Sequence, residues 1–180
     1  MKFLIASDLH GSVKYVKELL NAINKEQADR VILLGDLLYH GPRNGLSEEY
    51  DPQVVAELLN GIKNKLICVR GNCDAEVDQL LLDFPIMAKY AVMPVGSRLV
   101  YFTHGHVYNE NNLPPLCSGD ILVYGHTHVP LLKQVGQVVC MNPGSVSLPK
   151  NGSYHGYITL ENGVFYFKEV SGAIKNTFSI

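Results

Sequence analysis

Five short motifs gather histidine, aspartate and asparagine in a pattern that suits metal chemistry. They are Asp8-Leu9-His10, Gly35-Asp36, Gly71-Asn72-Cys73-Asp74, Thr103-His104-Gly105-His106 and Gly125-His126-Thr127-His128. Imidazole nitrogens mixed with carboxylate and amide oxygens favour Mn²⁺, Fe²⁺ or Zn²⁺ over a structural zinc held by cysteines. The ligand types therefore predict a metal centre, provided that the fold brings the five motifs together.

Each motif alone has an ordinary structural explanation. An aspartate two residues before a histidine suits a turn beside a surface histidine, and Gly-Asn is a common turn dipeptide. The pair His126 and His128 is more informative, because residues two apart in an extended chain point to the same side. Every motif also follows an apolar run. Open α/β sheets place their sites past the carboxyl ends of the strands, so we expect one shared rim.

The number of candidate ligands indicates two ions. About seven ligands exceed what one ion needs, whereas two ions that share Asp36 would use them all, at a spacing of about 3.5–4 Å. A bridging carboxylate reduces the repulsion between the ions, and a bridging water becomes hydroxide near neutral pH. Such a hydroxide attacks phosphorus in line while the cations neutralise the other phosphate oxygens. The predicted chemistry is the hydrolysis of a phosphate ester.

The first seventy residues predict repeated strand–helix units that position three of the motifs. Three apolar runs suit buried strands, at residues 2–7, 30–35 and 65–70. Ser12 is a helix N-cap, and the apolar residues from Val13 to Ile23 follow at helical spacing. Asp51-Pro52 predicts the start of a second helix, after a polar loop at residues 36–50.

The second half of the chain predicts short strands joined by hairpins. The expected strands are residues 90–95, 98–103, 121–124, 131–135, 138–141, 154–160 and 164–170. Turns at Gly96-Ser97, Gly136-Gln137 and Asn162-Gly163 are hairpin signals, and we expect a short polar tail after residue 170. Helices first and hairpins later indicate an α/β fold of two mixed sheets packed face to face, with helices outside.

Composition narrows the functional class. The chain has 180 residues, 47% hydrophobic and 18% charged, which predicts one folded domain over residues 1–180 and excludes disorder. A net charge of −2 without any run of like charge argues against a nucleic-acid groove or an anionic membrane surface as the partner. The four cysteines form no C-x-x-C pair and the first residues do not resemble a signal peptide, so we expect reduced thiols and a cytoplasmic protein.

Taken together, the motifs resemble those of the calcineurin-like metallophosphoesterases. Their order and spacing are most similar to the small bacterial YfcE-type phosphodiesterases, and residues 40–44 (His-Gly-Pro-Arg-Asn) and 142–145 (Asn-Pro-Gly-Ser) resemble that group too. The resemblance runs from Lys2 to about Phe167. It implies a four-layer α-β-β-α sandwich, the metallo-dependent phosphatase fold, which agrees with the two mixed sheets predicted from the elements.

The resemblance also implies a role for each candidate residue. Two divalent ions, Mn²⁺ first with Fe²⁺, Zn²⁺ or Ni²⁺ as alternatives, would bind at two sets of ligands. One set is Asp8, His10, Asp36 and His128, and the other is Asp36, Asn72, His104 and His126. Arg43 is the candidate phosphate contact, and its alternative is a solvated loop arginine. His106 either lines the pocket or lies in a supporting or surface position, while His40 and His155 stay unassigned.

One position departs from the superfamily pattern. Most members have a histidine after the asparagine ligand, thought to protonate the leaving group with help from the next acidic residue, whereas this chain has Cys73-Asp74. A thiol with a pKa of about 8.5 is a neutral but weak proton donor at pH 7. Cys73 either donates that proton or only fills space beside the metals, and in the second case Asp74 orients the Asn72 loop. We therefore expect a strong preference for leaving groups of low pKa.

Other functional classes fit the sequence less well. Gly144-Ser145 lacks the G-x-S-x-G pattern of a serine hydrolase, and no cysteine is followed six residues later by arginine, as in a cysteine phosphatase. A non-catalytic scaffold of this fold should show eroded ligands, yet every ligand position holds a competent residue. We expect a metal-dependent phosphodiesterase that acts on small diesters. A phosphomonoesterase is the first alternative and the scaffold the second, and a homo-oligomer is left open.

Overall fold

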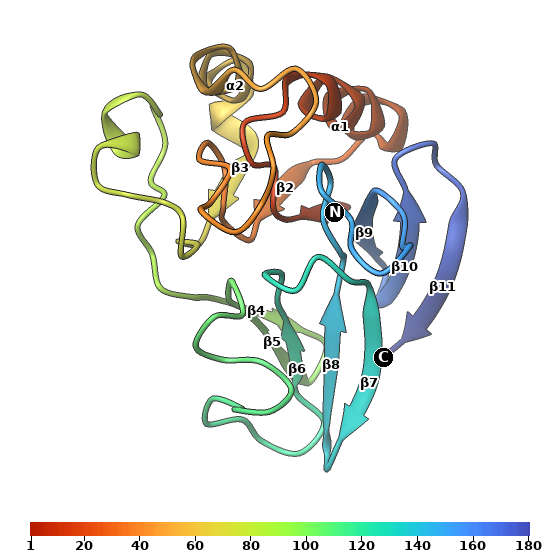
Figure 1. The fold of residues 1–180 in the computed structure, drawn as a ribbon. Coiled ribbons are helices and arrows are strands. Elements are labelled where there is room, and N and C mark those ends of the chain that lie inside the picture. Colours follow the sequence, from red (N-terminus) through yellow and green to blue (C-terminus); the bar gives the residue numbers. More distant parts are fainter.

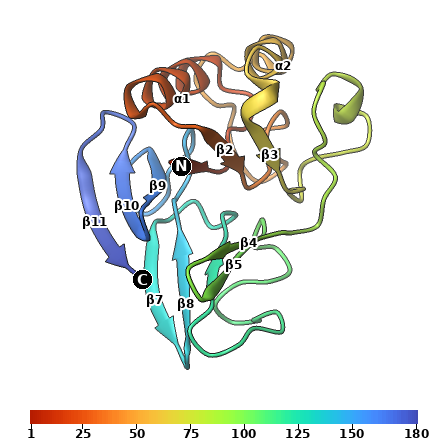
Figure 2. The same ribbon diagram turned by 180° about the vertical axis from the view of Figure 1, so that it is seen from behind.

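The computed structural model describes residues 1–180, and its framework is two β-sheets (Figures 1 and 2). The first sheet has six strands in the order β11-β10-β9-β1-β2-β3. Their bounds are β1 Phe3–Ala6, β2 Arg30–Leu33, β3 Leu66–Cys68, β9 Gly156–Glu161, β10 Val164–Glu169 and β11 Ile174–Ser179. Strands β1, β2 and β3 are parallel, whereas β9 joins β1 in the antiparallel sense, so this sheet is mixed.

The second sheet has five strands in the order β4-β5-β6-β8-β7. Their bounds are β4 Ala91–Val95, β5 Arg98–Phe102, β6 Ile121–Val123, β7 Leu131–Val135 and β8 Val138–Asn142. Strands β5, β6 and β8 are parallel, and the edge strands β4 and β7 are antiparallel to their neighbours. The three predicted hairpins join β4 to β5, β7 to β8 and β9 to β10.

The two sheets pack face to face around a shared apolar layer. Ile5 and Ile32 from the first sheet meet Val100, Val123 and Met141 from the second, and all five side chains are buried. Residues two apart on a strand share a face, so the alternate residues of each strand face the other way. The predicted arrangement of two mixed sheets packed against each other is confirmed.

Both α-helices lie on the outer face of the first sheet, where Figure 1 shows them side by side. Helix α1 covers Val13–Glu26, and the Ser12 side chain caps it by accepting a hydrogen bond from the Tyr15 N–H at 3.4 Å. Helix α2 covers Pro52–Asn60, and the Asp51 carboxylate accepts two N–H groups of its first turn at 3.1 Å. Both predicted N-caps are confirmed. No helix in the structure is both long enough and apolar enough to cross a membrane.

The outer face of the second sheet is covered by a loop layer. Leu122 and Tyr124 point away from the shared interior and pack against Leu113 and Leu116 of the connection between β5 and β6. This connection, residues 103–120, also carries one of the predicted metal motifs. Two short 3₁₀ turns, η1 (Lys63–Lys65) and η2 (Asp78–Leu80), complete the structure.

The prediction that the strands end at residue 170 and leave only a short polar tail is wrong. Residues Ile174–Ser179 form β11, an antiparallel edge strand on β10. Nearly all its side chains are exposed, so the strand shows no alternation of apolar and polar residues that a sequence pattern could reveal. Its main apolar contact is Phe178, opposite Phe165, with ring centroids 6.4 Å apart.

Candidate metal centre

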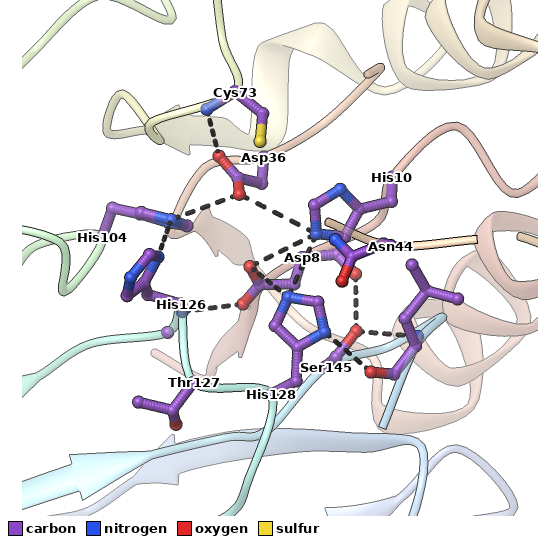
Figure 3. Close-up of polar contacts among 12 residues, drawn as sticks. Asp8, His10, Asp36, Asn44, Cys73, His104, His126, Thr127, His128 and Ser145 are labelled. Carbon is purple, nitrogen blue, oxygen red and sulfur yellow. Dashed lines mark hydrogen bonds and ion pairs between the residues drawn. The ribbon is translucent and has the colours of Figure 1, made fainter. Parts of the chain in front are cut away.

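The five predicted motifs meet at one rim where the two sheets adjoin. The motifs that begin at Asp8, Gly35 and Gly71 follow the parallel strands β1, β2 and β3 of the first sheet. The motifs that include His104 and His126 follow β5 and β6, which are parallel in the second sheet. Carboxyl ends of parallel strands lie on one edge, and Figure 3 shows side chains from all five motifs gathered around a common centre.

Five of the predicted ligands have a backbone conformation that is uncommon for residues other than glycine. The φ angles of Asp8, His10, Asp36, His126 and His128 are 58°, 46°, 56°, 67° and 61°. A left-handed conformation turns the chain sharply as it leaves the strand and aims the side chain back over the strand end. Such backbone strain tends to gather at functional sites. It also explains why β1 and β2 end before the predicted residues 7 and 35.

The glycines of the motifs make room for the carboxylates. A Cβ atom on Gly71 would lie 2.1 Å from Asp36 Oδ1, and one on Gly125 would lie 1.9 Å from Ser7 Oγ and 2.7 Å from Asp8 Oδ2. These distances are well below van der Waals contact. Gly71 and Gly125 are therefore required by close packing around the two aspartates.

The first group of ligand atoms, which we call the inner site, is formed by Asp8, His10 and His128 together with Asp36. Both histidine rings are oriented by the backbone, because His10 Nδ1 donates to the Tyr39 carbonyl at 2.8 Å and His128 Nδ1 donates to the Leu148 carbonyl at 2.7 Å. A carbonyl only accepts, so in a neutral ring the proton is on Nδ1 and Nε2 has a lone pair. The two Nε2 atoms lie 3.1 Å apart. A cation bound between them would offset the repulsion of their lone pairs.

Asp8 completes the inner site with an oxygen that has no hydrogen-bond partner. Its Oδ2 accepts the His126 backbone N–H at 3.0 Å, whereas its buried Oδ1 accepts no hydrogen bond. That Oδ1 lies 3.3 Å from His128 Nε2 and 3.7 Å from His10 Nε2. Burial opposes ionisation, yet the contacts with His10 and His128 outweigh it and hold the pKa of Asp8 well below its usual range. An orphaned, ionised oxygen beside two lone pairs fits a divalent cation.

The second group, the outer site, is formed by Asp36, Asn72, His104 and His126. His104 Nδ1 donates to the Leu34 carbonyl at 2.7 Å, which directs Nε2 into the centre. Three atoms surround that Nε2: Asn72 Oδ1 at 3.0 Å, His126 Nδ1 at 3.2 Å and Asp36 Oδ2 at 3.3 Å. All four atoms carry lone pairs when the histidines are neutral and Asp36 is ionised, the forms expected for metal ligands. The outer site therefore also fits a cation.

Asp36 lies between the two sites. Its Oδ1 accepts the Cys73 N–H at 2.8 Å, which fixes the carboxylate plane. Its Oδ2 is 3.3 Å from His104 Nε2 in the outer site and 3.8 Å from His10 Nε2 in the inner site. Burial alone would raise the pKa of the Asp36 carboxyl group, but the hydrogen bond from His104 and the positive charge of His104 lower it by more. The carboxyl group is therefore ionised at neutral pH. One oxygen therefore faces both sets of ligands, as the prediction of a shared aspartate requires.

The two histidines of the outer site have opposite proton affinities in the metal-free chain. Burial disfavours a charged His104, yet its contact with Asp36 and the charges of Asp8 and Asp36 raise its pKa to about 9. Burial and the neighbouring positive His104 lower the pKa of His126 to about 4. A metal that binds the outer site at neutral pH must therefore displace a proton from His104 but none from His126.

Further residues hold the ligands in place. The Ser145 and Ser147 hydroxyls donate to the Asp8 carbonyl at 2.8 and 2.9 Å. Ser145 belongs to the segment singled out by resemblance, but no pattern in the sequence points to Ser147. Asp74 accepts three backbone N–H groups, from Asp36, Leu37 and Gly71, at 2.7 to 2.9 Å. With both oxygens engaged in this way, Asp74 orients the loops that carry Asp36 and Asn72.

The other candidate residues lie around the mouth of the centre. Arg43, Cys73 and Lys150 line a small cavity of about 80 Å³ directly over the ligands. Cys73 Sγ lies within 4.8 Å of the nearest ligand atoms of His10 and Asp36. His106 is exposed in a neighbouring cavity, with its ring centroid 5.4 Å from that of His104 and 6.3 Å from that of His126. Sequence reasoning missed Lys150, an exposed loop lysine outside every motif.

Comparisons with known proteins agree with the site. Residues 1–163 match the family model described as the calcineurin-like phosphoesterase superfamily domain. The chain is 48% identical to phosphodiesterase YfcE of Escherichia coli K12 over 91% of this chain and 89% of that protein. It is 26% identical to phosphodiesterase MJ0936 of Methanocaldococcus jannaschii over 80% of this chain and 83% of that protein.

Solved structures extend the comparison to the fold. The structure of YfcE from E. coli, described as a phosphoesterase, superimposes with a TM-score of 0.96 at 44% identity and full coverage of both chains. Vps29 from Entamoeba histolytica superimposes with a TM-score of 0.64 at 20% identity, over 100% of this chain and 99% of that one. The second likeness is one of fold alone.

Proposed function

The chain belongs to the calcineurin-like phosphoesterase superfamily, and from this membership we propose that it hydrolyses small phosphodiesters at the inner and outer sites. The observation that carries the proposal is the convergence of lone pairs at the rim. Two backbone-oriented Nε2 atoms lie 3.1 Å apart beside a buried carboxylate oxygen that has no partner. Substantial identity to a relative named as a phosphodiesterase favours diesters over monoesters as the substrate.

Two divalent cations would bind this donor set. Asp8, His10 and His128 would hold one, Asn72, His104 and His126 the other, and Asp36 both. When bound, such cations neutralise the phosphate oxygens and acidify water so that hydroxide forms near neutral pH. Mn²⁺ is our first choice and Fe²⁺, Zn²⁺ or Ni²⁺ are the alternatives, because mixed imidazole and carboxylate donors accept all four.

The chain's own residues orient this chemistry. The imidazoles of His10, His104 and His128 are each fixed by a backbone carbonyl, so little reorganisation is needed when a substrate arrives. Arg43 and Lys150 bring positive charge to the cavity over the ligands. We assign them to binding the phosphate group, for which a guanidinium offers paired donors and an ammonium a point charge.

Proton delivery to the leaving group is the weak step of this site. Burial and the charge of Asp36 raise the pKa of Cys73 to about 12, so Cys73 is a neutral thiol at pH 7 and a poor acid. Asp74 positions the surrounding loops and has no free oxygen to assist. His106 lines the neighbouring cavity, where burial and the charge of His104 lower its pKa, so its imidazole is neutral at pH 7. The site therefore suits esters whose leaving group departs without protonation.

The experiment is a reconstitution assay. Protein stripped by a chelator is loaded with Mn²⁺, Zn²⁺, Ni²⁺, Mg²⁺ or no metal and tested on bis(4-nitrophenyl) phosphate and on 4-nitrophenyl phosphate. We expect metal-dependent cleavage of the diester at a kcat/KM above that of the monoester. Faster cleavage of the monoester would replace the proposal by a phosphomonoesterase, and no turnover with any metal would favour the scaffold alternative.

A further inference from the structure

A second and larger cavity opens beside the candidate metal centre. It measures about 530 Å³, against about 80 Å³ for the cavity directly over the ligands. Asn72 and His104, two outer-site residues, form the wall that it shares with the centre. Pockets of a few hundred Å³ hold small organic groups. A diester whose phosphate lies at the ligands would therefore extend one of its two substituents into this space.

Positive charge lines this cavity without any acidic residue to neutralise it. Arg70 and Lys89 are both in its wall, and neither forms an ion pair. The chain as a whole carries a net charge of −2, so the local excess opposes the overall sign. Unpaired cations next to a phosphate-binding centre attract a further anionic group.

The backbone ties the positions of the two basic residues together. The Arg70 N–H donates to the Ala88 carbonyl at 2.7 Å, which links the turn after β3 to the segment that carries Lys89. The Arg70 Nε donates to the Asp74 carbonyl at 3.1 Å. This contact orients the guanidinium and leaves its terminal nitrogens free. The guanidinium of Arg70 is thus preorganised for an acceptor such as a phosphate oxygen.

Another part of the cavity wall is a loop fixed by hydrogen bonds. Thr103 Oγ1 donates to the Tyr108 carbonyl at 3.1 Å, and Asn109 Nδ2 donates to the Gly105 carbonyl at 2.9 Å. These bonds close the turn after β5 and hold Val107 and Tyr108 at the cavity. The cavity therefore offers an apolar wall for a carbon skeleton and a cationic wall for its anionic end.

We propose that this cavity is a specificity subsite for diesters in which one substituent ends in a second phosphate group, bound by Arg70 and Lys89. The inference rests on the proposed function, because it needs the first phosphate at the inner and outer sites. It narrows the substrate class from small diesters in general to diesters with a phosphorylated substituent.

The test compares two synthetic substrates that share a nitrophenolate leaving group. One is 4-nitrophenyl 3-hydroxypropyl phosphate, and the other carries an additional phosphate on the terminal hydroxyl. A charge-assisted contact to phosphate contributes enough for us to expect a preference of about tenfold or more in kcat/KM for the phosphorylated substrate. Added salt should reduce this preference.

Two charge-reversal variants locate the effect. Lys89→Glu places a carboxylate in the subsite and should abolish or invert the preference. Lys17→Glu makes the same change of charge on the exposed side of α1 and should keep the wild-type ratio. Equal rates on both substrates in the wild type, or equal ratios in both variants, would overturn the subsite while leaving the diesterase intact. No cleavage of either substrate with any metal would instead overturn the proposed function, and the subsite with it.

Discussion

The two halves of the candidate centre differ most in how far they are open to solvent. In the inner site Asp8 and His10 are fully buried and His128 is 2% exposed. In the outer site Asn72 is exposed and His126 is half-buried, although His104 is as enclosed as the inner ligands. The inner ligands also receive more support, because Ser145 and Ser147 hold the Asp8 backbone from behind.

The difference suggests a division of labour between the halves. A closed site with preoriented ligands loses little on binding a cation and releases it slowly, whereas an open one exchanges its ligands with solvent and substrate. We expect the inner site to bind its metal more tightly and the outer site to face the substrate. The larger cavity supports this orientation, since it is lined by Asn72 and His104 and by no inner-site ligand, whereas the small cavity also touches His128.

The largest expected effect comes from Asp36, which belongs to both halves. Asp36→Asn keeps the size of the side chain but removes the shared charge, so metal binding weakens on both sides together. We expect activity to fall on the order of a thousandfold, because the metals supply several kcal/mol of transition-state stabilisation. Diesterase rate and metal content by mass spectrometry are the measurements.

Asp51→Asn is the matched control for this change. Asp51 caps α2 and belongs to none of the five motifs, and asparagine caps a helix about as well as aspartate. Its activity should stay near that of the wild type. Retained activity or two retained metals in Asp36→Asn would refute the shared ligand and, with it, the coupling of the two halves.

The next largest effect tests the ranking of the halves directly. His128→Ala removes an inner ligand and should lower the affinity of the tighter metal by more than about a hundredfold, since losing a mere supporting contact already costs about 10- to 100-fold. His126→Ala should leave one tightly bound metal and weaken only the second. Titration of metal into stripped protein measures both affinities. The opposite ranking would reverse the assignment of tight and exchangeable sites.

How much of the fold is predictable from sequence follows from where each element is buried. α1 was predictable from a helical apolar pattern, β1 and β8 from continuous apolar runs, and β4 from alternation, because burial imposes each of these patterns. The edge strand β11 is held by its pairing with β10 and buries little of itself, so no such pattern arises. The loop layer over the second sheet is equally irregular.

In the candidate site, the ligand residues could be predicted from the sequence, whereas some of the residues around them could not. All seven candidate ligand positions could be predicted because five motifs, each after an apolar run, occur together in one chain, and the structure brings these side chains to one rim. Ser147 and Lys150 reach the site only because loops of the folded chain bring them there, and the local sequence does not encode that position. The asymmetry of the halves is likewise a property of packing between both sheets.

A smaller effect tests whether His104 of the outer site carries a proton in the metal-free protein. The pKa of His104 lies near 9, above its unfolded value of about 6.5, so metal-free protein holds this proton at neutral pH and loses it above about pH 9. The affinity of the outer site should therefore rise about tenfold per pH unit up to about pH 9 and level off above it. Calorimetry in buffers of different ionisation enthalpy measures the released proton. His104→Gln should abolish this part of the slope, and an unchanged slope would assign the proton elsewhere.

The smallest expected effect concerns the protonation of the leaving group at the outer site. Cys73 borders the small cavity and is a weak acid, so Cys73→His should supply the missing proton donor. We expect about a tenfold gain for alkyl leaving groups and little change for nitrophenolate, which departs without protonation. Cys117→His, at an exposed thiol outside the cavities, is the matched control. An equal gain for all leaving groups would mean that the residue at position 73 affects the rate through packing and not through proton donation. The outer site would then differ from the inner site only in its exposure to solvent.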